Sequence, residues 1–464
     1  MAKVTRRSLV AGSAMLGLAP RRLWAAAATG HLTLQPSGTA RDFLDSVGVS
    51  AHWDYRDTSY GRYRQQIAQA IVDLGVRHLR GYDPEFAPEL ASRGVMSLLT
   101  AGPEYGSPAT IATLVRKANA KAKVLAAIEG PNEPDLFWRG PRYRWHGQGF
   151  PEGVLSYQRD LYTYFKSAPD LADLTIIGPS LGRTYDPGGG YPNPFAAGSL
   201  TDAVDWGNFH PYPGGNPFSP PFRYGGIARY YSSATFPSAA LDEFPANFTT
   251  YAPPFAPKPM SATETGYSTF AGGSSEATQA KYMPRLVAEY FRLGIKRAYL
   301  YEIIDLRPDP GGQERDSHFG LLRADATPKP AYRALKGLLD LLDDGQDGTP
   351  ASSLPAPVEL SFSLPEGYDR PQYVHALLLR RSLQDLVLLY WHEVASSSSA
   401  TKPFTDIEVP EGDLSLSLSP GLRAVAWHRY AADGTFVRHA VEGRTPLPSL
   451  PLEDRIVAVV LRQD

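Results

Sequence analysis

Two glutamates that follow short apolar runs are the first candidates for chemistry in this sequence. The run from Val124 to Ile128 leads into the sequence Glu-Gly-Pro-Asn-Glu-Pro, which is how a buried parallel strand ends when the chain turns into a loop. Glu133 then lies at a strand end, with the amide of Asn132 beside it, and is placed to give up a proton. A second short run, Met260 to Thr263, is followed by Glu264. Two carboxyl groups at strand ends suit acid–base or nucleophilic catalysis.

The composition is that of a globular protein with an unusual aromatic content. The 464 residues are 43% hydrophobic and 20% charged, with a formal net charge of −2, so we expect a sizeable core and no nucleic-acid partner. Cysteine is absent, which excludes disulfides and thiol chemistry. The 26 Tyr and 7 Trp residues offer flat faces of the kind that stack on sugar rings, although most of them will lie in the core.

The first 28 residues have the pattern of an export signal. A pair of arginines, Arg6-Arg7, precedes the apolar run Leu9 to Ala19, and small residues at 25–28 resemble a cleavage region. This pattern predicts a signal peptide of the twin-arginine type over 1–28, with a Sec signal as the alternative. We therefore expect an exported protein, periplasmic or extracellular. No later stretch reaches the length of a membrane span, so we expect no membrane partner after signal removal.

From residue 45 onward, short strands alternate with helices. The patterns of apolar residues predict eight strands, at Val47–Trp53, Val76–Gly81, Val95–Ala101, Val124–Ile128, Leu174–Pro179, Val204–His210, Met260–Glu264 and Arg297–Ile304. Helical stripes lie between several of them, for example at Ile67, Ile71 and Leu74, and one helix follows the last strand. Eight strands with crossover helices favour an α/β fold, a (β/α)₈ TIM barrel, over residues 31–345.

The remaining chain, 346–464, predicts a second domain. The stretch Asp344 to Pro357 is typical of a linker, and beyond it short strands alternate apolar and polar residues without helical patterns. An antiparallel β-sandwich is the expected fold. His31 to Leu34, in the segment 31–45, is a candidate for an additional strand of this domain.

In a (β/α)₈ barrel the active site forms at the carboxyl ends of the strands. The polar and aromatic residues at these ends are His52, Trp53, Arg80, Asn132, Glu133, His210, Tyr212, Glu264, Tyr301, Glu302 and Asp305. Two carboxylates from opposite sides of a barrel, with an Arg and a Tyr to support one of them, are the groups that glycoside hydrolysis requires. His52 and His210 have no metal-ligand spacing, so we expect no metal and no cofactor.

Three motifs resemble those of clan A retaining glycoside hydrolases, of the family 39 and family 5 type. They are Gly-Pro-Asn-Glu-Pro at 130–134, Thr-Glu-Thr-Gly-Tyr at 263–267, and the segment from Ser317-His318-Phe319-Gly320 to Pro328-Lys329-Pro330-Ala331-Tyr332. The resemblance covers residues 45–345. It implies a (β/α)₈ barrel that cleaves β-glycosidic bonds in a polysaccharide or oligosaccharide with retention of configuration.

The resemblance also implies roles for individual residues. Glu133 matches the acid/base and Glu264 the nucleophile of a double displacement through a glycosyl-enzyme. Asn132 matches the residue that binds the sugar 2-hydroxyl, Arg80 the arginine that keeps the nucleophile charged, and Tyr212 the tyrosine that donates a hydrogen bond to it. The expected separation of the two carboxyl groups is about 5 to 5.5 Å.

The sequence also departs from the pattern of the clan. Strand eight presents Tyr301-Glu302 where many of these enzymes have a tryptophan, and strand three lacks a histidine, so Trp53 is the candidate for the surface under the cleaved sugar. The alternative for Arg80 is a buried ion-pair partner without a catalytic part, and the alternative for His210 is a hydrogen-bonded barrel histidine.

Long loops at the barrel mouth slightly favour endo action. The alternatives to a hydrolase are a transglycosylase that uses the same two glutamates and a carbohydrate-binding barrel without activity.

Overall fold

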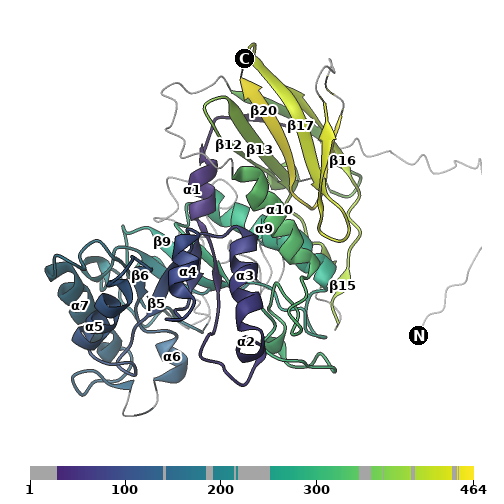
Figure 1. Cartoon of the computed structure of the whole chain (residues 1–464). Coiled ribbons are helices and arrows are strands. Elements are labelled where there is room, and N and C mark those ends of the chain that lie inside the picture. The colour runs from purple at the N-terminus through teal and green to yellow at the C-terminus, as the bar shows by residue number, and fades with distance from the viewer. Residues whose placement is uncertain are drawn as a thin grey trace, which may run out of the picture.

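The computed structural model describes residues 29–463 except 139, 141–142, 184–191, 214–215, 218–250, 344–356, 369, 399–402, 442–446 and 448. A barrel of parallel strands and a β domain lie side by side, with helices between them (Figure 1). The predicted signal peptide and nearly all of the predicted linker lie outside the described residues.

Eight parallel strands form the barrel. They are β3 (Val47–Ser50), β4 (His78–Arg80), β5 (Met96–Thr100), β6 (Leu125–Glu129), β7 (Thr175–Ile177), β8 (Gly207–Phe209), β9 (Met260–Thr265) and β10 (Ala298–Leu300). Their order in the sheet is β7-β6-β5-β4-β3-β10-β9-β8, and a parallel bridge between Ile177 and Trp206 joins the two edges. The predicted (β/α)₈ barrel is confirmed, with each strand inside its predicted segment or one residue beyond it.

Helices cover the outside of the barrel, and their ends follow the local sequence. They are α1 (Ala40–Asp45), α2 (Ser59–Arg62), α3 (Arg64–Leu74), α4 (Ala87–Ser92), α5 (Pro108–Asn119), α6 (Pro134–Phe137), α7 (Glu152–Ser167), α9 (Glu276–Arg292) and α10 (Pro330–Leu342). Ser107 caps α5 and Pro108 occupies its first turn, which is the expected N-terminal chemistry. Helix α3 ends at Gly75 with φ 81°, a left-handed conformation that favours glycine.

Two antiparallel sheets form the β domain. One contains β1 (Thr29–Leu34), β11 (Val358–Ser363), β16 (Gly412–Ser417) and β19 (Leu450–Leu452). The other contains β2 (Gly38–Thr39), β12 (Val374–Arg380), β13 (Asp385–His392), β17 (Leu422–Tyr430), β18 (Phe436–Ala440) and β20 (Val457–Gln463), and a short pair, β14 (Ser397–Ser398) with β15 (Thr405–Asp406), lies beside them. The predicted antiparallel β-sandwich is confirmed. Strand β1 pairs with β11 in register from Thr29 to Leu34, so the N-terminal segment enters this domain before the barrel begins.

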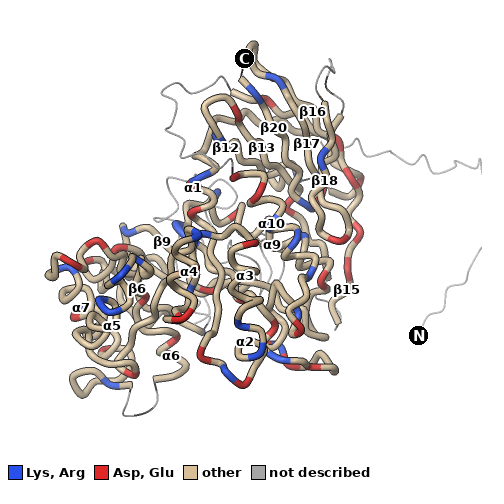
Figure 2. Tube along the Cα trace, in the orientation of Figure 1, with Lys and Arg blue, Asp and Glu red and all other residues tan. Residues whose placement is uncertain are grey.

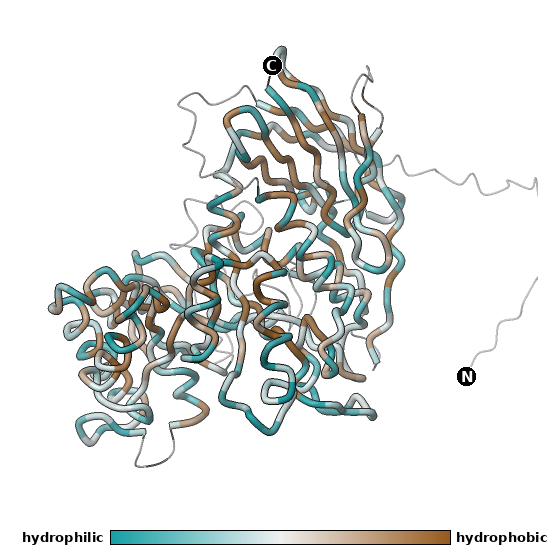
Figure 3. Tube along the Cα trace, viewed as in Figure 1, coloured by the Kyte–Doolittle hydropathy of each residue, from teal (hydrophilic) through white to brown (hydrophobic). Residues whose placement is uncertain are grey.

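The β domain and the barrel share one hydrophobic core. Leu377, Leu389 and Trp391 of the six-stranded sheet belong to the same buried cluster as Leu335 and Leu338 of α10. The strands of this domain carry long hydrophobic stretches (Figure 3), whereas basic and acidic residues alternate over both parts of the chain (Figure 2). Because the sheet lies directly on α9 and α10, the β domain has a fixed place relative to the barrel.

In the described part of the chain, no helix combines the length and apolar character that crossing a membrane requires.

Candidate active site

Strand β6 delivers Glu133 through a tight turn. Gly130 has no room for a side chain, because a Cβ there would lie 2.0 Å from Oε1 of Gln158. Glu133 itself adopts the left-handed conformation, with φ 43° and ψ 48°, which is uncommon for a residue with a side chain. Gly182 lies against its carboxyl group, since a Cβ at 182 would come within 2.7 Å of Cδ of Glu133. The turn therefore fixes where this carboxyl group lies.

Strand β9 holds Glu264 across the barrel mouth. Its Oε1 accepts a hydrogen bond from Nη1 of Arg80 at 2.6 Å, and its Oε2 accepts one from the hydroxyl of Tyr212 at 2.8 Å. Burial raises the pKa of Glu264, but the charges of His210 and Arg80 and the Tyr212 hydroxyl outweigh it and hold the pKa below its usual value. Glu264 is therefore an ionised carboxylate, as a nucleophile must be.

The two glutamates lie within reach of one bond between sugars. One carboxyl oxygen of Glu133, one of Glu264 and a ring nitrogen of His210 all lie within 4.8 Å of one another. Retaining glycosidases separate their carboxyl groups by about 5 to 5.5 Å, whereas inverting enzymes need about 6.5 to 9.5 Å for an intervening water. With an oxygen of each carboxyl group in one 4.8 Å cluster, the pair is closer to the retaining range than to the inverting one.

Arg80 connects three acceptors under the site. Besides Glu264, its Nη2 donates to Oδ1 of Asn132 at 2.7 Å, and its Nε donates to Oε2 of Glu129 at 2.5 Å. Burial raises the pKa of Glu129, but the charge of Arg80 and a hydrogen bond from His210 lower it to about 2. Because Oδ1 of Asn132 faces Arg80, its Nδ2 has no acceptor among the described residues and is free to donate to a ligand.

His210 lies between the two candidate catalytic groups. Its Nδ1 is 2.8 Å from Oε1 of Glu133 and 3.6 Å from Oε2 of Glu264, and its Nε2 is 2.9 Å from the hydroxyl of Thr263. Burial lowers the pKa of His210, but the charge of Glu264 and hydrogen bonds to Glu129 and Glu133 raise it to about 10. At neutral pH the ring is an imidazolium that donates on both sides.

His52, Tyr301 and Glu302 form a second cluster, at the ends of β3 and β10. The hydroxyl of Tyr60 donates to Oε2 of Glu302 at 2.6 Å, and Nε2 of His52 lies 3.8 Å from the same oxygen. Burial raises the pKa of Glu302 well above its usual value and so favours the protonated form of this carboxyl group. Burial also lowers the pKa of His52 to about 4. The rings of Tyr55 and His52 stack at 4.7 Å, and that of Tyr301 meets His52 edge-on at 5.3 Å.

Trp53 does not lie where the sequence interpretation placed it. The indole is 3% exposed, stacks on Phe86 at 5.3 Å, and has the guanidinium of Arg64 5.7 Å from its ring centroid. These contacts are those of a packed side chain, and they leave no open face for a sugar. Strand β3 ends at Ser50, so Trp53 lies beyond its last paired residue, in the turn that follows.

Residues that sequence reasoning missed support the base of the site. Glu129, Asn208 and Thr263 are all buried. Nδ2 of Asn208 donates to Oε1 of Glu129 at 3.1 Å, and the Thr263 hydroxyl donates to the same oxygen at 2.7 Å. A charged residue as the last residue of a buried strand was the available signal for Glu129, whereas Asn208 and Thr263 gave none.

Three side chains of the site also have the spacing of metal ligands. Glu133, His210 and Glu264 are close enough to hold an ion. However, both oxygens of Glu264 already accept hydrogen bonds, and the site contains the charged Arg80 and an imidazolium at His210. A cation would meet two positive charges there, so the electrostatics of these residues oppose a resident metal.

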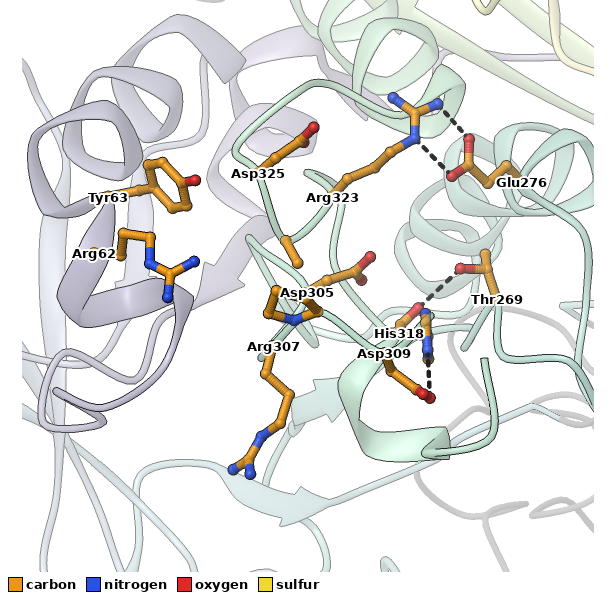
Figure 4. Close-up of a pocket in the computed structure, with 12 residues that line it drawn as sticks. Arg62, Tyr63, Thr269, Glu276, Asp305, Arg307, Asp309, His318, Arg323 and Asp325 are labelled. Atoms are coloured by element: carbon orange, nitrogen blue, oxygen red, sulfur yellow. Dashed lines mark hydrogen bonds and ion pairs between the residues drawn. The ribbon is translucent and has the colours of Figure 1, made fainter. Parts of the chain in front are cut away.

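A separate hollow of about 440 Å³ opens beside the ends of β9 and β10 (Figure 4). Its acidic groups mostly have partners: Glu276 pairs with Arg323 at 2.6 Å, Asp309 with His318 at 3.1 Å, and Asp305 with the buried Lys329 at 2.8 Å. Asp305, which the sequence placed at the end of strand eight, thus takes part in an ion pair that anchors the following loop to α10.

The search of solved structures finds proteins with the same fold. A family 39 glycoside hydrolase from the gut symbiont Bacteroides cellulosilyticus WH2 matches at TM-score 0.53 and 15% identity, over 94% of this chain and 88% of that one. A monomeric β-xylosidase from Caulobacter crescentus CB15 matches at TM-score 0.53 and 13% identity, over 93% and 98%. A glucosidase from Croceicoccus marinus matches at TM-score 0.53 and 12% identity, over 94% and 99%.

These matches span both the barrel and the β domain, so the resemblance to the family 39 type is confirmed for the fold. No protein-family model matches the sequence. The search of curated proteins finds no match either.

Proposed function

We propose that this protein is a secreted retaining glycoside hydrolase that cleaves β-glycosidic bonds in a polysaccharide or oligosaccharide. The observation that carries the proposal is the pair Glu133 and Glu264, with a carboxyl oxygen of each inside one 4.8 Å cluster. Arg80 and Tyr212 hold Glu264 ionised, as a nucleophile must be, and Nδ1 of His210 contacts Oε1 of Glu133.

In the first half-reaction, a carboxylate oxygen of Glu264 attacks the anomeric carbon of the sugar. The bond from that carbon to the glycosidic oxygen breaks, and Glu133 delivers its proton to the leaving oxygen. The products are a glycosyl ester on Glu264, a released alcohol and a carboxylate at Glu133. The His210 imidazolium, 2.8 Å from Oε1 of Glu133, stabilises that new negative charge.

In the second half-reaction, Glu133 acts as the base. A water molecule gives a proton to the Glu133 carboxylate and attacks the anomeric carbon, the ester bond breaks, and the electron pair returns to Glu264. Two inversions give net retention. The free Nδ2 of Asn132 is placed to donate to a hydroxyl next to the reacting carbon, a contact that strengthens as positive charge develops on the ring.

The proposed substrate is a class of sugars and not one named sugar. Two proteins of similar fold are described as a β-xylosidase and a glucosidase, which favours a neutral β-linked sugar for this site. We keep endo action as the preferred mode, on the basis of the long loops after strands four to six. Export by the twin-arginine route follows from the sequence of residues 1–28, and the working compartment is then periplasmic or extracellular.

A transglycosylase is the second candidate function, because it shares the first half-reaction and differs only in the acceptor. A carbohydrate-binding barrel without activity is disfavoured by the pKa of Glu264. This pKa is held low by the charges of His210 and Arg80 even though all three side chains are buried.

The test is release of reducing ends from a panel of β-linked polysaccharides and aryl β-glycosides by wild type, Glu264→Gln and Glu276→Gln. Glu276 pairs with Arg323 away from the two glutamates, so its variant controls for the loss of a carboxylate. Wild type and Glu276→Gln should release sugar, Glu264→Gln should not, and NMR should show the β-anomer first. Equal release by all three would disprove the nucleophile, whereas products longer than the substrate would identify a transglycosylase.

A further inference from the structure

The loop after β8 carries two groups of the candidate site and is held at several places. His210 and Tyr212 both contact the catalytic glutamates. Between them, the carbonyl of Pro211 accepts hydrogen bonds from the hydroxyls of Thr265 at 3.0 Å and Tyr290 at 2.8 Å. These contacts come from β9 and α9, so the barrel fixes the start of the loop.

Beyond Tyr212, whose ring packs on Phe319 at 5.4 Å, the next hydrogen bond of the described loop residues comes from the β domain. Asn216, four residues beyond Tyr212, is 2% exposed, and its Nδ2 donates to Oε1 of Glu393 at 2.7 Å. Glu393 directly follows β13. Among the hydrogen bonds of the described loop residues 210–213 and 216–217, this one leads to the β domain, so a residue outside the barrel holds Asn216.

Glu393 is a rigid partner for this contact. Its side chain is fully buried, and Arg285 of α9 binds both of its oxygens, with Nε 2.9 Å from Oε2 and Nη2 2.8 Å from Oε1. The indole of Trp391 donates to Oε2 at 2.9 Å. Arg285 also donates to the carbonyls of Val394 and Asp454. A bidentate arginine–carboxylate pair with additional hydrogen bonds holds its geometry closely.

The same carboxylate belongs to a group of possible metal ligands, Glu289, His375 and Glu393, whose donor atoms lie within 4.8 Å. Arg285 already pairs with Glu393, and Arg292 pairs with Glu289 at 3.0 Å. Two guanidinium groups thus supply the charge that an ion would bring. The cluster fits an ionic anchor between helix α9 and the β domain better than a metal centre.

We propose that Glu393 is a positioning residue for the reaction: through Asn216 it holds the loop so that the Tyr212 hydroxyl stays on Glu264. The inference rests on the proposed function, in which Glu264 is the nucleophile. It gives the β domain a part in catalysis, since a displacement of about 1 Å in a catalytic group can cost a hundredfold in rate.

The test compares Asn216→Ala with Lys281→Met. The first removes the loop contact and leaves the Arg285–Glu393 pair intact. The second removes a different contact between α9 and the β domain, the ion pair of Lys281 with Asp454 at 2.8 Å, and does not touch the loop. We expect Asn216→Ala to lower kcat roughly ten- to a hundredfold with little change in KM, and Lys281→Met to change the melting temperature without changing kcat.

A double-mutant cycle shows whether Asn216 acts through Tyr212. If it does, Asn216→Ala combined with Tyr212→Phe should be no slower than Tyr212→Phe alone. The acidic limb of the pH profile should also move to higher pH in Asn216→Ala, because Glu264 loses a hydrogen-bond donor. Additive losses, or an unchanged profile and kcat, would overturn the proposal.

Two measurements keep the inference testable if no glycoside is cleaved. A crystal structure of Asn216→Ala should show the distance from the Tyr212 hydroxyl to Oε2 of Glu264 lengthened from 2.8 Å to beyond hydrogen-bond range. Carbon-13 NMR should show a higher pKa of Glu264 in this variant only. An inactive wild type with these two changes would refute the hydrolase proposal alone, while an unmoved Tyr212 would refute the positioning role.

Discussion

Arg80 donates from Nη1 to Oε1 of Glu264 at 2.6 Å, while the other side of the same guanidinium is bound to Glu129. One buried cation thus serves a candidate nucleophile and a carboxylate, Glu129, that is fully buried. The two tasks, ionising Glu264 and neutralising Glu129, can be separated by mutation.

Replacing Arg80 by methionine should impair both stability and activity. The unpaired Glu129 would cost about 3 to 5 kcal/mol of unfolding free energy, as for other broken buried pairs. The pKa of Glu264 would rise, so the acidic limb of kcat/KM would move to higher pH. The double variant Arg80→Met with Glu129→Leu should recover most of the stability in urea unfolding and none of the activity. Recovery of activity would show that Arg80 is only a structural ion-pair partner.

Tyr212→Phe should reduce kcat by roughly ten- to a hundredfold, with KM nearly unchanged, because the lost hydrogen bond supports the charged nucleophile. Tyr157→Phe is the matched control, since the Tyr157 hydroxyl donates to the carbonyl of Gly106 away from the site. Steady-state kinetics on an aryl β-glycoside separate the two. Equal kcat values for both variants would remove Tyr212 from the mechanism.

His210 should make stability depend on pH on the alkaline side. Its pKa is raised to about 10 in the folded protein, against about 6.5 for an unfolded histidine. The folded state therefore holds a proton that the unfolded state loses, and the stabilisation, roughly 3 to 5 kcal/mol at most, is present below pH 6.5 and lost as pH rises toward 10. Urea unfolding of wild type and His210→Gln between pH 6 and 10 measures it. Parallel curves for the two proteins would contradict a charged His210.

Glu302→Gln should leave stability nearly unchanged at acid pH and become stabilising as pH rises through neutral. Burial raises the pKa of Glu302 well above its usual value, so the folded state favours the protonated acid, which the amide resembles in shape and charge. Above the pKa of an unfolded glutamate, about 4.3, folding of wild type must take up a proton at this group, so wild type loses stability with rising pH and the variant becomes the more stable of the two. Tyr60→Phe, which leaves a buried oxygen of Glu302 without its donor, should cost about 1 to 3 kcal/mol. Thermal melts over a pH series compare all three.

The positions of Glu133 and Glu264 could be predicted because strand ends are local events. An apolar run that stops at Gly or Pro marks both the strand and the residue at its tip, and a parallel barrel brings all such tips to one face. The same reasoning brought Arg80, His210 and Tyr212 to the mouth.

The features that could not be predicted are the packing of a side chain beyond its strand and a contact between residues far apart in the sequence. Trp53 follows its strand as closely as His52 does, but its indole packs on Phe86 and Arg64, and no periodic pattern distinguishes the two beyond the last paired residue. The link from Asn216 to Glu393 joins residues 177 positions apart, on a loop and a strand end without a motif. Such contacts follow from the packed structure, which a linear pattern does not contain.

The left-handed backbone of Glu133 has a consequence for how this protein balances folding against chemistry. A residue with a side chain at φ 43° lowers the free energy of unfolding by about 1 kcal/mol or more. Glycine does not carry this cost. Selection for folding alone would therefore favour glycine at this position, and an inactive Glu133→Gly protein should melt at a higher temperature than wild type. With Glu133 as the proposed acid/base, the protein gives up stability for activity at this residue.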